Sequence, residues 1–136
     1  MPRFSKEERL KSTKKIETLV KKGSVIYESP IKVIWRKNEY HSPDKQSKNK
    51  VAFSVAKKRF KKAVDRNRIK RLLREAYRLN KHLLAKEKNS TESVLLLFIY
   101  TGNEILTFKQ ACESVKKIMI KISSEVKQQN SNKPNE

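Results

Sequence analysis

Cysteine, glycine and acidic residues are scarce in this sequence of 136 residues. A single cysteine excludes a disulfide framework and a metal site made of thiolates. Two glycines are too few for a glycine-rich loop around a phosphate. The 14 acidic residues are scattered, without a D-x-D or E-x-x-H grouping. Because metal-dependent nucleases hold their ions with clustered carboxylates, we expect no catalytic residue and no protein-bound metal in this chain.

The other residues capable of nucleophilic or ligand chemistry stand alone. Cys112 occupies an apolar position in a helical pattern, which favours a small core residue over a nucleophile. His41 falls in a polar stretch and His82 near the end of a basic segment, and neither belongs to a catalytic or metal-ligand grouping. We therefore expect both histidines at the surface.

Long apolar runs are also missing. The longest one, Val94 to Tyr100, is too short to span a bilayer. The first residues, Met1 to Lys6, lack the apolar core of a secretory signal. These two features predict a cytoplasmic protein without a membrane-spanning segment.

Positive charge is what the sequence has in excess. Its 34 Lys and Arg residues give a net charge of +20 and a pI near 10.2. The stretch from Lys57 to Lys81 contains twelve of these basic residues and only two acids, and so carries half of the net charge. Such a concentration of one sign predicts a polyanionic partner, which leaves RNA, DNA and anionic membranes as candidates.

Most of this stretch has the period of an amphipathic helix, with one apolar and one basic face. The apolar face is formed by Ile69, Leu72, Leu73, Ala76, Leu79 and Leu83. The opposite face is formed by Arg66, Asn67, Lys70, Arg71, Arg74, Arg78 and Lys81. Glu75 is spaced to pair with Arg71 and Arg78, which indicates a structural role. A solvated surface, a membrane or a calmodulin-like groove also suits a basic amphipathic helix, but the one-sided charge favours nucleic acid.

The remaining pattern predicts a single α/β domain over residues 1–126, in the form of an α+β two-layer sandwich. Expected elements are a first helix at 14–22, strands within 24–37 that break at Pro30, a strand at 50–56, the basic helix, a strand at 94–100 and a last helix ending near 126. Capping residues at Ser5, Ser12 or Thr13 open the first helix, Gly23 ends it in a left-handed conformation, and Thr107 with Gln110 opens the last. Residues 36–50 are expected to form a loop and 127–136 a disordered polar tail.

The order of residues around the basic helix resembles the bacterial ribonuclease P protein family. The matching positions are Ser54 to Lys58, Ala63-Val64, Arg66 to Arg71 and Arg74-Glu75, with Arg66-Asn67-Arg68 as the family hallmark. An isolated Arg-Asn-Arg is common, whereas the whole motif directly after a strand is specific for the family. The resemblance covers roughly Lys6 to Ser123.

This resemblance implies a fold and a function. The fold would be a four-stranded sheet with a left-handed βαβ crossover through the basic helix, against the usual right-handed preference. The protein would bind the catalytic RNA of ribonuclease P and the 5′ leader of precursor tRNA. It would assist magnesium-dependent endonucleolytic removal of that leader, with the Mg²⁺ ions and the catalysis residing mainly in the RNA. Membranes and DNA would not be partners.

The resemblance also implies the contact residues. Contacts to the catalytic RNA would come from Arg66, Asn67, Arg68, Lys70, Arg71 and Arg74, and a local backbone cap is the alternative role of Asn67. Lys57 and Lys58 would contact leader or RNA, or else form a solvated surface. The family's first helix carries leader-binding aromatics where Ile16 and Val20 stand here, and these two residues suit core packing as well. Trp35 is the candidate replacement for stacking on the leader, with the core as its alternative position.

Three other function classes are compatible with the charge. A general basic RNA-binding or ribosome-associated structural protein would not activate a catalytic RNA. A DNA-binding regulator would need a helix-turn-helix pair, which a strand directly before the basic helix does not provide. A protein-only nuclease would need metal ligands. We therefore favour the ribonuclease P function, with a general RNA-binding function as the alternative.

Overall fold

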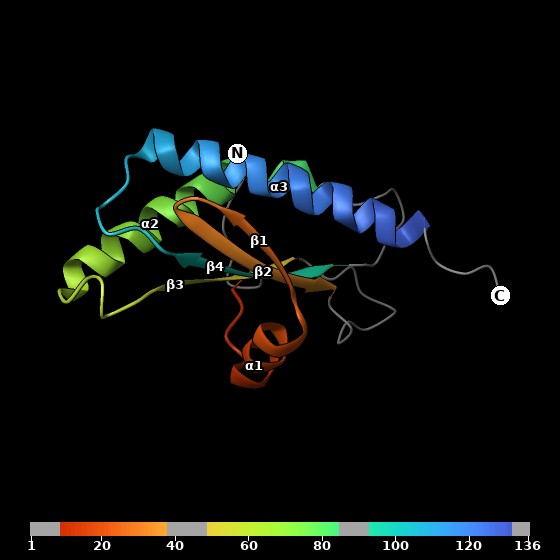
Figure 1. Cartoon of the computed structure of the whole chain (residues 1–136), viewed down its shortest axis with the longest axis horizontal. Helices are drawn as coiled ribbons and strands as arrows, with labels where there is room; N and C mark the ends of the chain where they lie inside the picture. Colours follow the sequence, from red (N-terminus) through yellow and green to blue (C-terminus); the bar gives the residue numbers. More distant parts are fainter. Residues whose placement is uncertain (1–8, 38–48, 85–92, 132–136) are drawn as a thin grey trace.

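The structure, a computed structural model, describes residues 9–37, 49–84 and 93–131. Its elements are α1 (Thr13–Lys22), β1 (Ser24–Glu28), β2 (Ile31–Lys37), β3 (Lys50–Val55), α2 (Ala63–Asn80), the 3₁₀ helix η2 (Lys81–Leu84), β4 (Val94–Tyr100) and α3 (Phe108–Ser131). The mixed α/β class and the predicted order of helices and strands are confirmed (Figure 1).

The four strands form one sheet in the order β1-β2-β4-β3. β1 and β2 are antiparallel and are joined by the short turn at Ser29 and Pro30, as the break at Pro30 predicts. β2 and β4 are also antiparallel, whereas β3 and β4 are parallel neighbours. Parallel neighbours need a crossover connection, which α2 provides. The left hand of this crossover stays a prediction from the resemblance.

Helices cover both faces of the sheet (Figure 1). α2 and α3 lie on one face, and α1 lies on the other, which we call the α1 side. Because successive residues of a strand point to opposite faces, β4 contributes to two apolar clusters. Leu96 and Phe98 pack toward α2 and α3, whereas Leu95 and Leu97 pack on the α1 side. The continuous apolar run of β4 is thereby explained.

The buried stripe of α2 consists of Ile69, Leu73, Ala76 and Tyr77. Leu79, which the helical pattern assigns to the core, is 40% exposed instead. Tyr77 takes its place and packs edge-on against Phe98 at a ring-centroid distance of 6.0 Å. The stripe is therefore turned slightly from the predicted direction, while its centre at Leu73 is as predicted.

Helix ends agree with the sequence in two places and differ in one. Ser12 caps α1 by accepting a hydrogen bond from the Lys15 amide at 3.3 Å, and the Thr107–Gln110 capping box of α3 is present. Ser5 lies outside the described residues. The predicted left-handed conformation of Gly23 is wrong, because its φ of −73° and ψ of 156° are those of extended backbone. A Cβ at this position would collide with the Leu19 carbonyl and an Ile34 methyl, so close packing explains the glycine.

The predicted boundaries of the loop and the tail also shift. Residues 36 and 37 belong to β2 and residue 50 to β3, while 38–48 lie outside the described part of the chain. α3 continues to Ser131, so residues 127–131 are helical and not part of a disordered tail. The rest of that predicted tail, 132–136, is not among the described residues.

Candidate nucleic-acid interface

The loop between β3 and α2, residues 56–62, displays lysines around one buried anchor. Phe60 is only 7% exposed and packs on Tyr100 at a ring-centroid distance of 5.9 Å. The residues on either side of it, Lys57, Lys58, Arg59, Lys61 and Lys62, are all exposed. Fixing Phe60 in the core therefore holds a positively charged loop at the surface. Lys57 and Lys58 are therefore accessible to a ligand, and their contact with leader or RNA stays a prediction.

Arg66 connects this loop to α2. Its Nη1 donates hydrogen bonds to the carbonyls of Phe60 at 2.7 Å and Lys61 at 2.9 Å. These carbonyls precede the helix, where a guanidinium can satisfy them without disturbing the helical ladder. Arg66 is consequently half-buried and has a structural role that its predicted outward position does not suggest. Any contact to RNA must use the part of its guanidinium that these bonds leave available.

The six predicted residues on α2, which we call the basic face, differ in exposure. Asn67, Arg68 and Arg71 are exposed, whereas Arg66, Lys70 and Arg74 are half-buried. Within the part of the chain that the structure describes, the Asn67 side chain makes no hydrogen bond, so its alternative role as a local cap gains no support. The predicted ion pair forms between Glu75 and Arg78 at 2.9 Å. The freest guanidinium groups of the face are those of Arg68 and Arg71.

The α1 side of the sheet is only partly covered. α1 packs Leu19 fully into the cluster with Ile34 and Leu97, and Ile16 lies partly buried against the same cluster. Val20 is 53% exposed. Ile16 is thus a packing residue with a remaining accessible edge, and Val20 is available at the surface beside it.

Trp35 is the one candidate that the structure removes. Its ring is 1% exposed, and its indole N–H donates to the Glu125 carboxylate at 2.8 Å. β2 alternates, so Ile34 points to the α1 side and Trp35 to the side of α2 and α3. A ring buried in this way cannot stack on a base. The prediction of Trp35 as a stacking platform is wrong, and its alternative, the core, is correct.

Two exposed residues were not among the predicted contacts. Tyr27 on β1 is 58% exposed, and Arg59 lies in the exposed loop before α2. Period-two alternation in Ser24 to Glu28 was the available signal for Tyr27, because a buried Ile26 places Val25 and Tyr27 on the opposite face. Arg59 belongs to the basic stretch from Lys57 to Lys81, but no local pattern distinguished it from the other cations there.

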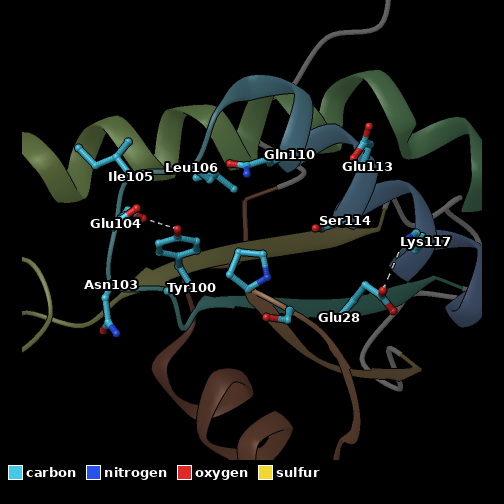
Figure 2. A pocket seen from close by; sticks show the side chains of 13 residues that line it. Glu28, Tyr100, Asn103, Glu104, Ile105, Leu106, Gln110, Glu113, Ser114 and Lys117 are labelled. Atoms are coloured by element: carbon cyan, nitrogen blue, oxygen red, sulfur yellow. Dashed lines mark hydrogen bonds and ion pairs between the residues drawn. The ribbon is translucent and has the colours of Figure 1, made fainter.

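A cavity of about 560 Å³ lies between the β1–β2 turn, the loop after β4 and the start of α3 (Figure 2). Glu28, Glu104 and Glu113 contribute to its lining. A hydrogen bond from Lys121, at 2.7 Å, and the nearby Lys117 hold the pKa of Glu28 below its ordinary value. Carboxylates in the wall disfavour a phosphate ligand, so we do not assign nucleic acid to this cavity.

Cys112 and His82 occupy the kinds of position that the sequence predicts. Cys112 is half-buried against the core, and burial raises the pKa of its thiol. His82 is exposed, as predicted, and His41 is outside the described residues. Over residues 9–37, 49–84 and 93–131, no three potential metal ligands gather in one place. None of the helices in those ranges has the length and hydropathy to cross a membrane.

Comparison with known proteins gives one consistent family. The family model described as ribonuclease P matches residues 4–123. The ribonuclease P protein component of Porphyromonas gingivalis is 37% identical over 124 residues, which cover 90% of this chain and 88% of the relative. That of Chlorobaculum tepidum is 48% identical over 56 residues, 38% of this chain and 36% of the relative.

Solved structures share the fold. The RNase P protein from Thermotoga maritima superposes with a TM-score of 0.66 at 23% identity, covering 84% of this chain and 96% of that one. The Staphylococcus aureus RNase P protein gives 0.60 at 22% identity, covering 85% and 94%. With its Arg-Asn-Arg helix displayed on this sheet, the chain belongs to the ribonuclease P protein family.

Proposed function

We propose that this protein binds the catalytic RNA of ribonuclease P and the 5′ leader of precursor tRNA, and thereby assists removal of the leader. The observation that carries the proposal is the exposed array on α2 and the loop before it. Arg68 and Arg71 project from a helix whose other side is fixed in the core through Leu73. The charges are therefore presented by a rigid element, as recognition of a folded RNA requires.

The basic face of α2 is suited to phosphate contacts. Guanidinium forks engage phosphate oxygens through two parallel hydrogen bonds. Each phosphate that is neutralised releases condensed counterions, which makes binding favourable and strongly dependent on salt. Asn67 lies between Arg66 and Arg68 with its amide exposed, and so adds a donor and an acceptor for a base or ribose. Contacts to the catalytic RNA are assigned to this face.

The leader is assigned to the α1 side of the sheet. The exposed Val20 lies at its edge on α1, and Lys57 and Lys58 follow directly after β3. A single strand needs a positively charged path and apolar or flat contacts for its bases. In this proposal Val20 supplies an apolar contact and the two lysines supply the charge, whereas the cavity beside α3 has Glu28, Glu104 and Glu113 in its lining.

In this proposal the RNA performs the chemistry. The magnesium ions are held mainly by the catalytic RNA, and the hydrolysis of the phosphodiester takes place there. The protein contributes positive charge near two RNA strands that repel each other, and this lowers the ion concentration needed for their association. The site of action is the cytoplasm. These assignments rest on the family, because ribonuclease P contains an RNA partner.

The test is cleavage of a precursor tRNA by a bacterial ribonuclease P RNA at limiting magnesium. It compares the RNA alone, the protein alone and both together. We expect leader removal at low magnesium only when both are present. Tight, salt-sensitive RNA binding without any stimulation of cleavage would refute the proposal and favour a general basic RNA-binding protein.

A further inference from the structure

One row of residues crosses the α1 side of the sheet beyond the area that α1 covers. Strand register places Tyr27 beside Lys32, Lys32 beside Ile99, and Ile99 beside Ser54. Tyr27 is 58% exposed, Ser54 is exposed, and Lys32 and Ile99 are half-buried. The row is therefore an open strip with an aromatic ring at one end and a half-buried aliphatic residue near its centre.

The Tyr27 ring is held at both ends. Its Cβ is fixed by β1, and its hydroxyl lies 3.5 Å from Oγ1 of Thr101 in the loop after β4. The Thr101 hydroxyl donates to the Pro30 carbonyl at 2.9 Å, so its oxygen is free to accept from Tyr27. The Thr101 amide donates to the same carbonyl at 2.9 Å. A ring restrained in this way loses less conformational entropy than a free one when a flat ligand stacks on it.

Two cations lie near the ring. Lys32 is the cross-strand neighbour of Tyr27, at a spacing that brings their side chains together. Arg59 comes from the opposite edge, donates to the Asn103 side chain at 2.9 Å, and lies within electrostatic range of the Tyr27 hydroxyl. The arrangement combines one flat apolar surface with two positive charges nearby. A base with its adjacent phosphates has the complementary shape and charge.

We propose that Tyr27 is a stacking platform for one unpaired base of the leader, with Lys32 and Arg59 contacting phosphates close to that base. The inference rests on the proposed function, which assigns the leader to the α1 side. Tyr27 would take the stacking role that Trp35 cannot have, because Trp35 is buried on the other face of the sheet.

The experiment uses the holoenzyme assembled from this protein and a bacterial ribonuclease P RNA. Its affinity is measured at one salt concentration for precursor tRNA with a leader of several nucleotides and for mature tRNA, which has none. Base stacking on an aromatic side chain corresponds to between about fivefold and about 150-fold in affinity. We expect Tyr27→Ala and Tyr27→Leu to weaken binding of the precursor by a factor in this range and to leave mature tRNA unaffected. Tyr27→Phe and Tyr27→Trp should retain most of the affinity.

The matched control is Phe108→Ala, which removes a 44% exposed aromatic from α3 on the other side of the sheet and should change neither affinity. Unchanged precursor binding by Tyr27→Ala, or full affinity in Tyr27→Leu, would overturn the stacking role. Equal weakening for precursor and mature tRNA would also overturn it, since Tyr27 would then act on assembly or on the catalytic RNA. Failure of the unsubstituted protein to favour the precursor would instead refute the leader assignment itself.

Discussion

Removing Arg68 and Arg71 together should flatten the salt dependence of RNA binding. Both side chains are exposed on α2, so their replacement by alanine leaves the core unchanged. Alanine also has a high helix propensity, and the helix itself should persist. The double variant therefore tests contact with RNA separately from folding.

The expected magnitude follows from counting phosphate contacts. Each contact contributes about 0.7 to 0.9 to the slope of log K against log salt, so two lost contacts lower the slope by about 1.4 to 1.8. Over a fourfold rise in salt, the affinity of the original protein should fall by about tenfold more than that of the variant. The assay is a titration of the protein against ribonuclease P RNA at several salt concentrations.

A second double variant, Lys109→Ala with Lys116→Ala, provides the control. It removes the same amount of positive charge from exposed positions on α3. If the basic face of α2 is the contact, this variant should keep nearly the original slope. An unchanged slope for the α2 variant, or equal flattening in both, would refute the assignment of the catalytic RNA to α2.

Three further predictions concern stability. Leu73→Ala should lower the free energy of unfolding by about 2–5 kcal/mol, because Leu73 is fully buried at the centre of α2. A denaturant titration that shows almost no loss would mean that the neighbouring side chains fill the space or that another face of the helix is buried. Arg66→Ala should cost about 1–2 kcal/mol in the same titration through the bonds to the Phe60 and Lys61 carbonyls, and Arg66→Lys should not restore it. For Glu28 the bond from Lys121 keeps the folded pKa below the ordinary 4.5, so its carboxylate stabilises the fold above that pH and the contribution is lost as the pH falls through the folded value. The melting temperature of Glu28→Gln should accordingly be lower than that of the original protein at neutral pH, and the two values should converge in acid. A constant difference across this pH range would contradict the dependence of stability on the ionisation of Glu28.

Several elements were predictable because their information is local. The capping box of Thr107 and Gln110 involves residues three positions apart. The apolar stripe through Leu73 repeats within one helix, and a continuous run such as β4 indicates a strand covered on both faces. Period and capping depend on neighbouring residues, so they can be recognised without knowing the rest of the fold.

Other features depended on residues far away in the chain. Trp35 points to α3 and binds Glu125, 90 positions later, and no pattern near Trp35 specifies that partner. The Tyr27 hydroxyl meets Thr101, 74 positions away. Gly23 is required by an Ile34 methyl that approaches only after β2 has paired and α1 has packed on it. Each of these errors or omissions involves a contact made by the assembled sheet.

The sequence by itself determined the sign of the charge, the amphipathic helix that concentrates it and the Arg66-Asn67-Arg68 motif, and with them the family and the class of partner. These properties are carried by composition and by residues within a few turns of one another. Only the tertiary structure decided which basic groups are free to act, because Arg66 is engaged by loop carbonyls while Arg68 is exposed. It also decided which aromatic ring faces the α1 side, since strand pairing and helix packing select one face of the sheet for Tyr27 and the other for Trp35.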